Sequence, residues 1–120
     1  MLAPVAEDMQ RVDALIRQRL DSDVALVREV AGYIVGAGGK RLRPALLLLA
    51  ARACGYRGEA RLPVAGVVEF IHTASLVHDD VVDESPLRRG RRTANAAFGN
   101  AAAVLVGDFL YSRAFQMMVE

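Results

Sequence analysis

PVAGVVEFIHTASLVHDDVVD, residues 63–83, is the segment from which the fold class follows. The β-branched residues between Val64 and Ile71 would also suit a strand. Strands rarely exceed about ten residues, however, and this segment continues for roughly twice that length before Ser85-Pro86 gives the first turn signal. We therefore predict one long helix from about Pro63 to Asp83.

Two helices are predicted before this segment. Apolar residues at spacings of three and four indicate helical faces from Val5 to Leu20 and from Val24 to Val35. Between them, Asp21-Ser22-Asp23 provides a stop and a new N-cap. Gly36, Gly38 and Gly39 end the second helix.

Two further helices complete the expected pattern. One runs from Ala45 to about Cys54, and its Leu46–Leu49 run is apolar on every side, so we expect it to be deeply buried. The last begins near Asn95 or Asn100 and continues to Glu120 without a C-cap signal. We expect an all-α protein in which residues 1–120 form the N-terminal part of a single larger domain.

The composition excludes several function classes. The chain has 120 residues, of which 53% are hydrophobic, and its 15 basic residues nearly balance 14 acidic ones. A packed core is therefore expected, and a net charge of +1 excludes bulk attraction to nucleic acid or membranes. The single cysteine cannot form an internal disulfide. No secretory signal or membrane-spanning segment is evident, so we expect a cytoplasmic protein.

The sequence Asp79-Asp80-Val81-Val82-Asp83 is the strongest candidate for a functional site. On a helix, Asp79 and Asp83 lie on one face with Cβ atoms about 5–6 Å apart. Like charges at that spacing destabilise a helix, and carboxylates near its C-terminus oppose the macrodipole. Magnesium would offset both costs, because it is typically held by one or two carboxylates together with substrate phosphates. The pattern predicts a Mg²⁺ site at Asp79 and Asp83.

A solvated acidic helix end would explain the same carboxylates without a metal, particularly if they pair with the arginines of residues 88–92. The preceding turns, Phe70 to Val77, are mostly apolar. Acids that follow a buried helix favour a site at the mouth of a cavity.

A second candidate site is Gly38-Gly39-Lys40-Arg41-Leu42-Arg43-Pro44. The glycines allow close approach of a ligand, and the following helix N-terminus favours an anion. Lys40 and Arg43 suit a diphosphate. A nucleotide-binding P-loop is excluded because no Ser or Thr follows Lys40. The alternative is a glycine-rich helix break with solvated charges.

A third candidate is the arginine run Arg88-Arg89-Gly90-Arg91-Arg92. Such a run could bind nucleic-acid phosphates, and that alternative predicts salt-dependent DNA binding. The run lacks interleaved aromatic residues and the chain lacks a net basic charge. Beside an acidic metal site, these arginines are better explained as ligands of a diphosphate.

His72 lies two turns before Asp79 on roughly the same helix face. A lone histidine on an apolar helix is commonly a core residue, but here it is expected to point into the same cavity. Glu69 and His72 also have the Glu-x-x-His spacing of di-iron bundles. That site needs a second such pair, and the other histidine, His78, has Ser75 at the required position.

A magnesium site, two diphosphate-binding basic clusters and an apolar helical interior fit the ionisation of an apolar diphosphate. Three segments carry a resemblance to a known family: GGKRLRPALLLLA (38–50), EFIHTASLVHDDVVDESPLRRGRRTAN (69–95) and VLVGDFLYSRAF (104–115). The chain resembles the trans-polyprenyl diphosphate synthases, in particular the octaprenyl, solanesyl and decaprenyl synthases that make quinone side chains. This resemblance implies an isoprenoid-synthase-type helical bundle around a central cavity, and a homodimer.

The resemblance also implies roles for individual residues. Asp79, Asp80 and Asp83 match the first aspartate-rich motif, which holds Mg²⁺ on the allylic diphosphate, and Arg88 matches a contact to that diphosphate. The residues that match the isopentenyl diphosphate site are Lys40, Arg43, His72 and Arg89. The implied reaction is the head-to-tail (1'-4) condensation of isopentenyl diphosphate onto an allylic primer such as farnesyl diphosphate.

Family members also carry a second aspartate-rich motif and a Lys-Thr pair, and these 120 residues contain neither. We therefore predict that this chain alone is catalytically inactive. A non-catalytic subunit of a heteromeric prenyl synthase is the alternative, although such a subunit need not retain all three motifs.

Product length follows from the residues one turn before Asp79. Ala74 and Ser75 are both small, whereas a bulky aromatic residue there would block a growing prenyl chain. We expect a long product, and the resemblance implies eight to ten isoprene units.

Overall fold

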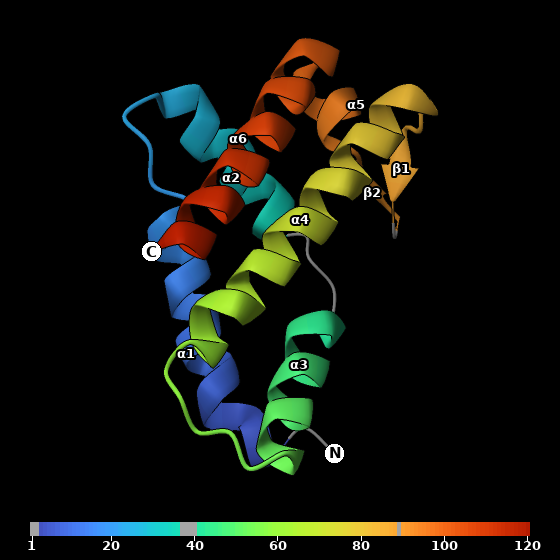
Figure 1. The fold of residues 1–120 in the computed structure, drawn as a ribbon. Helices are drawn as coiled ribbons and strands as arrows, with labels where there is room; N and C mark the ends of the chain where they lie inside the picture. Colours follow the sequence, from blue (N-terminus) through green and yellow to red (C-terminus); the bar gives the residue numbers. More distant parts are fainter. Residues whose placement is uncertain (1–2, 37–40, 89) are drawn as a thin grey trace.

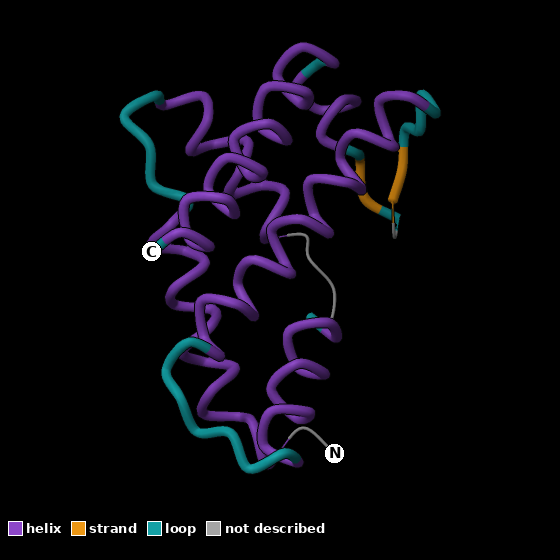
Figure 2. Tube along the Cα trace, in the orientation of Figure 1, coloured by secondary structure: helices purple, strands orange, loops and turns teal. Residues whose placement is uncertain are grey.

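The computed structural model describes residues 3–36, 41–88 and 90–120. Lys40 and Arg89, two of the expected diphosphate ligands, lie outside these ranges. The elements are almost all helical, as Figure 2 shows. In chain order they are a 3₁₀ turn (Ala3–Val5), α1 (Ala6–Arg19), α2 (Ala25–Gly36), α3 (Leu42–Ala53), α4 (Arg61–Val82), β1 (Leu87–Arg88), β2 (Arg91–Arg92), α5 (Ala94–Phe98) and α6 (Asn100–Val119).

The long helix predicted from residues 63–83 is confirmed as α4, which begins two residues earlier and has 22 residues. It forms the axis of the molecule, and α6 packs along its side (Figure 1). At 1.5 Å per residue it is about 33 Å long, which is most of the 44 Å longest dimension of the fold. The shortest dimension is 19 Å, about the thickness of two helix layers.

Close approach of α4 and α6 depends on a glycine. Gly107 faces the imidazole of His78, and a Cβ at this position would overlap the ring. The His78 Nε2 atom lies 3.3 Å from the carbonyl oxygen of Val104 and 3.4 Å from a carboxylate oxygen of Asp108. His78 is therefore occupied by the α4–α6 contact and is not available as the second ligand of a di-iron pair.

The helix boundaries follow the turn signals closely. Ser22 accepts a hydrogen bond at Oγ from the backbone N–H of Val24, just before α2. The last helical segment is divided at Gly99, whose φ of 94° is a left-handed conformation that glycine adopts without strain. Both expected starting points are consequently used, since α5 begins beside Asn95 and α6 begins at Asn100.

The expectation that Leu46–Leu49 would be buried on every side was wrong. Leu48 is 1% exposed, whereas Leu46 is 56% exposed. The reason is that α3 contacts the remaining described helices mainly through one face, against α4. Its opposite face has no described neighbour.

The segment between Pro86 and Thr93, which carries the arginine run, contains a short antiparallel hairpin. Leu87 pairs with Arg92, and Arg88 pairs with Arg91. Figure 1 shows this hairpin beside the C-terminal end of α4. The hairpin thus carries the arginine run back toward the acidic end of the long helix.

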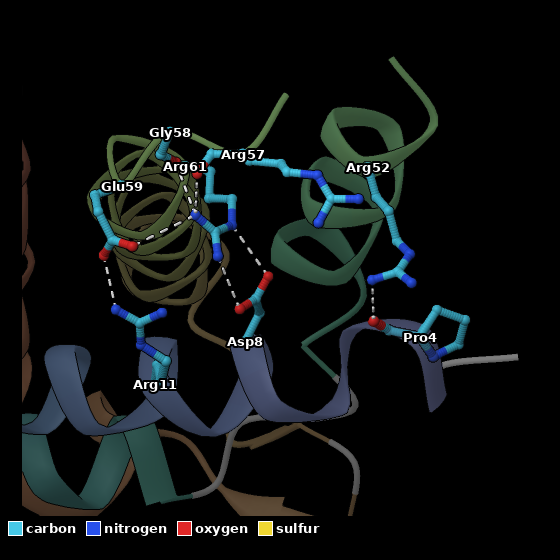
Figure 3. A network of polar contacts seen from close by, with 8 residues as sticks. All are labelled: Pro4, Asp8, Arg11, Arg52, Arg57, Gly58, Glu59 and Arg61. Atoms are coloured by element: carbon cyan, nitrogen blue, oxygen red, sulfur yellow. Dashed lines mark hydrogen bonds and ion pairs between the residues drawn. The ribbon is translucent and has the colours of Figure 1, made fainter. Parts of the chain in front are cut away.

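The opposite end of α4 is tied to α1 by ion pairs (Figure 3). Arg61 donates from Nε and Nη2 to the two carboxylate oxygens of Asp8, each at 3.1 Å. Arg11 on α1 donates to Glu59 at 2.7 Å. None of the described helices is long and apolar enough to cross a bilayer.

Candidate active site

The start of α3, the second half of α4, the end of α2 and the hairpin enclose a cavity of about 360 Å³. Its apolar wall includes Ile34, Val35, Leu76 and Val77. Its charged and imidazole side chains are Arg41, Arg43, Glu69, His72, Asp80, Arg88, Arg91 and Arg92. Four of the predicted site residues, Arg43, His72, Asp80 and Arg88, therefore line one cavity.

Arg43 and His72 are in direct contact across this cavity. The Nη1 atom of Arg43 lies 3.0 Å from Nε2 of His72. Because a guanidinium group can only donate, Nε2 of His72 is the acceptor and carries no proton in this arrangement. These residues are 29 positions apart in the chain, and the packing of α3 on α4 brings them together.

Asp80 and Arg88 form a second pair at the cavity wall. Arg88 donates from Nε and Nη2 to the two carboxylate oxygens of Asp80 at 3.0 and 2.8 Å. The hydrogen bonds that Arg88 donates to Asp80 raise the pKa of Arg88 above its ordinary value, assisted by the negative charges of Asp80 and Asp79. The Asp80 side chain is 10% exposed. Its position is therefore that of a residue that orients Arg88.

Asp79 and Asp83 have a different environment from that of Asp80. Both are exposed at the C-terminal end of α4, and the N–H of Asp83 donates to the carbonyl oxygen of Asp79 at 2.8 Å. The two residues thus lie one helical turn apart, as the spacing predicted. Neither carboxylate forms an ion pair with a described residue.

The carboxylates of Asp79 and Asp83 fit a magnesium ion by their donor chemistry, since Mg²⁺ prefers oxygen ligands and retains positions for substrate phosphates. Over residues 3–36, 41–88 and 90–120, no three His, Cys, Asp or Glu side chains form a cluster that would hold a metal. A pair of carboxylates would therefore need the substrate's phosphate oxygens to complete the coordination.

Tyr33 on α2 holds the hairpin against the cavity, a role that no sequence motif indicated. Its hydroxyl donates to the carbonyl oxygen of Arg92 at 2.7 Å, and the Arg91 guanidinium lies 4.0 Å from the ring centre. Phe98 packs edge-on against the same ring, with the centroids 5.2 Å apart. Thr93 donates to the carbonyl oxygen of Ser85 at 2.7 Å and caps α5.

The balance of charge makes the cavity an anion site. The carboxylates of Glu69 and Asp80 are both occupied, by Arg41 at 3.6 Å and by Arg88 at 2.8 Å. No carboxylate of the described chain forms an ion pair with Arg43, Arg91 or Arg92, which all line the cavity. These three guanidinium groups therefore leave net positive charge in the cavity.

Ala74 and Ser75 do not line this cavity. Ala74 is completely buried in the helical core, and the Ser75 hydroxyl lies 2.8 Å from the hydroxyl of Tyr111 on α6. Ser75 therefore faces α6, and the influence of both residues on product length remains a prediction.

Comparison with known proteins assigns the family. The family described as polyprenyl synthetase matches residues 24–120. The chain belongs to this family. Octaprenyl diphosphate synthase of Escherichia coli is 63% identical over 113 residues, which cover 94% of this chain and 35% of the relative. The chain thus spans about a third of the length of this curated relative.

Solved structures of polyprenyl synthetases agree with the fold. A decaprenyl diphosphate synthase from Rhodobacter capsulatus superposes with a TM-score of 0.92 at 55% identity, over 98% of this chain and 37% of that one. A polyprenyl synthase from Caulobacter crescentus, solved with calcium and isoprenyl diphosphate, gives a TM-score of 0.92 at 51% identity, over 98% and 36% of the two chains. The expected isoprenoid-synthase-type all-α fold is confirmed.

Proposed function

We propose that the gene product carrying these residues condenses isopentenyl diphosphate head-to-tail (1'-4) onto an allylic diphosphate. The observation that carries this proposal is the contact between Arg43 and His72 in a positively charged cavity. His72 lies on α4, the helix whose C-terminal end carries Asp79 and Asp83. One part of such a site would hold a diphosphate, and the other a metal-bound diphosphate.

Each of the candidate site residues has a task in this reaction. Asp79 and Asp83 would hold Mg²⁺, which would neutralise the allylic diphosphate and make it a good leaving group. Arg88, oriented by Asp80, donates to the allylic diphosphate. Arg43 donates to the diphosphate of isopentenyl diphosphate, and His72, which accepts from Arg43, completes this side of the site, so that the double bond of the substrate is held toward the ionising carbon. Lys40 and Arg89 are proposed to assist at that second diphosphate.

The apolar wall formed by Ile34, Val35, Leu76 and Val77 excludes water from the allylic carbocation. Attack by the isopentenyl double bond forms the new carbon–carbon bond, and loss of a proton completes the step. Exclusion of water favours this condensation over simple hydrolysis of the primer.

We infer a long all-trans product of eight to ten isoprene units. The names of the octaprenyl and decaprenyl synthases that this chain resembles support that range. A product of this kind is suited to the side chain of a quinone such as ubiquinone. We further propose that the described residues belong to one synthase domain, and that the active form is a cytoplasmic homodimer.

Incubation of the complete gene product with farnesyl diphosphate, labelled isopentenyl diphosphate and Mg²⁺ tests this proposal. The extracted prenyl alcohols are then sized by chromatography. A ladder that ends at eight to ten units is expected, and omission of Mg²⁺ should abolish it. Absence of incorporation while diphosphate still binds would contradict the proposal and favour a non-catalytic subunit.

A further inference from the structure

Arg41, the residue just before α3, has a backbone conformation that is costly for a residue with a side chain. Its backbone is left-handed, with φ 51° and ψ 47°, a region that non-glycine residues rarely occupy unless surrounding contacts impose it. Only 13% of its side chain is exposed. Arg41 is thus a cation that is mostly shielded from solvent and held in a strained backbone conformation, two residues before Arg43.

The guanidinium group of Arg41 contacts residues of three helices, α1, α2 and α4. Its Nη2 atom donates to the carbonyl oxygen of Val35 at the end of α2, at 3.4 Å. Its Nε atom lies 2.9 Å from Oδ1 of Asp13 on α1, and Nη1 lies 3.6 Å from Oε1 of Glu69 on α4. The Asp13 contact is an ion pair without hydrogen-bond geometry, since Oδ1 accepts no hydrogen bond. These contacts surround the residue whose backbone is left-handed just before α3.

Glu69 on α4 is a buried carboxylate that needs the positive charge of Arg41. Only 7% of Glu69 is exposed, and a buried carboxylate without a counter-ion is strongly unfavourable. Arg41 is the cation that faces it. The Glu-x-x-His spacing of Glu69 and His72 therefore reflects two different tasks, one carboxylate that neutralises Arg41 and one imidazole that contacts Arg43.

Two parallel links consequently join the start of α3 to one face of α4. Arg41 contacts Glu69, and two residues later Arg43 contacts His72, one helical turn further along α4. The Arg41–Glu69 pair has no net charge, whereas the Arg43–His72 contact retains the charge of Arg43. The Arg41–Glu69 pair thus fixes the position of the start of α3, and the charge of Arg43 is left for a ligand.

We propose that Arg41 is a positioning residue: by pairing with Glu69 and Asp13 it fixes the start of α3 and holds Arg43 against His72 for the diphosphate of isopentenyl diphosphate. This inference rests on the proposed function for the identity of that ligand. The geometric claim itself requires only that a diphosphate binds between Arg43 and His72.

The experiment compares Arg41→Gln with Arg61→Gln in the complete gene product. Arg61 is a matched control, because its side chain is 15% exposed and also ties α4 to α1, at the opposite end of the helix (Figure 3). Both variants should lower the melting temperature. Only Arg41→Gln should raise KM for isopentenyl diphosphate, by about tenfold, the effect of one lost charge-assisted contact. KM for the allylic primer should stay within about twofold of wild type for both variants.

Arg41→Lys provides the conservative variant, and it keeps the experiment informative if Arg41→Gln does not fold. Lysine retains the charge but cannot reach two carboxylates with a rigid fork, so it should restore stability more completely than KM. Equal KM values for wild type, Arg41→Lys and Arg61→Gln would overturn the proposal. Equal increases of both KM values in the Arg41 variants would also overturn it, because a general loss of structure would then be sufficient.

Calorimetric titration with inorganic diphosphate separates this inference from the proposed function. Weaker diphosphate binding to the Arg41→Lys variant than to Arg61→Gln would support the positioning role even if wild type transfers no prenyl group. Conversely, active wild-type enzyme with unchanged diphosphate binding in the Arg41 variants would refute the positioning role alone.

Discussion

Asp79 and Asp83 are exposed carboxylates beside Asp80, a buried carboxylate that is already bound to Arg88. Replacing an exposed aspartate by asparagine should therefore affect metal binding, whereas the same change at Asp80 should affect the position of Arg88. Asp83→Asn should lower kcat at least about 100-fold, because the substitution removes a ligand of the Mg²⁺ ion whose charge would stabilise the leaving diphosphate. The half-saturating Mg²⁺ concentration should rise at the same time.

Asp23→Asn is the control for this substitution, since Asp23 is an exposed acid just before α2 and makes no contribution to the cavity. Steady-state rates measured over a magnesium titration provide the comparison. An Asp83→Asn enzyme with wild-type kcat and wild-type magnesium dependence would exclude the metal site.

The hypothesis that small side chains at positions 74 and 75 allow a long product can be tested one residue at a time. Ala74→Phe and Ser75→Phe should each shorten the product to fewer than eight units, because a ring there blocks the growing chain. Ala74 is completely buried, so its variant should also lose stability through over-packing by about 1–3 kcal/mol. Ser75→Phe, at a partly exposed position, separates product length from stability. Unchanged product length in both variants would refute the hypothesis.

At the scale of secondary-structure elements, the α4–α6 interface determines whether the site helix is rigid. Leu110 is fully buried, whereas Leu105 on the same helix is 53% exposed. Leu110→Ala should therefore reduce the free energy of unfolding by about 2–5 kcal/mol. Leu105→Ala should change it by less than about 0.5 kcal/mol.

Denaturant unfolding of the two leucine variants measures this difference directly. The substitution removes the same atoms in both cases, so any difference between the variants reports burial. Similar losses in the two variants would mean that α6 does not pack on α4 through the face that includes Leu110.

At the scale of the whole molecule, Asp8 near the N-terminus and Arg61 at the start of α4 form a pH-sensitive contact between α1 and α4. The hydrogen bonds from Arg61 hold the pKa of Asp8 below its ordinary value. A carboxylate with a lowered folded-state pKa stabilises the fold above the unfolded-state pKa of about 4, and this contribution is lost as the pH falls through the folded-state pKa.

Wild type should therefore melt about 1–2 °C above Asp8→Asn at pH 7, a small difference because the pair is partly solvated. The difference should shrink as the pH falls through the lowered pKa of Asp8 and vanish once the carboxyl group of Asp8 is protonated, because residue 8 is then uncharged in both proteins. Melting temperatures recorded from pH 7 to pH 2.5 test this. A difference that does not change with pH would show that packing of the side chain is responsible instead of its charge.

A second prediction at this scale concerns catalytic competence. The 120 residues contain one aspartate-rich motif, and the polyprenyl synthetase resemblance implies a second one and a Lys-Thr pair. The chain expressed alone should therefore give no prenyl product under conditions in which the complete gene product does. The same radiolabel assay applies to both, and condensation by the well-folded 120-residue chain would disprove the prediction.

The local pattern of residues 63–83 was sufficient to predict the long helix, because helix formation depends on spacings of three and four within one segment. The same local rule placed Asp79 and Asp83 one turn apart. Glycine and capping signals located most boundaries, since they act on the nearest few residues.

Which side chains meet across helices depends on long-range packing. The contacts of Arg43 with His72, Arg41 with Glu69 and Tyr33 with Arg91 depend on how helices cross, which no local spacing encodes. Burial was misjudged at Leu46 for the same reason, because an apolar run does not say which of its faces finds a neighbour. The sequence by itself thus determined the helices and the residue types of the site, and long-range packing determined which of those residues are paired and which remain available for a ligand.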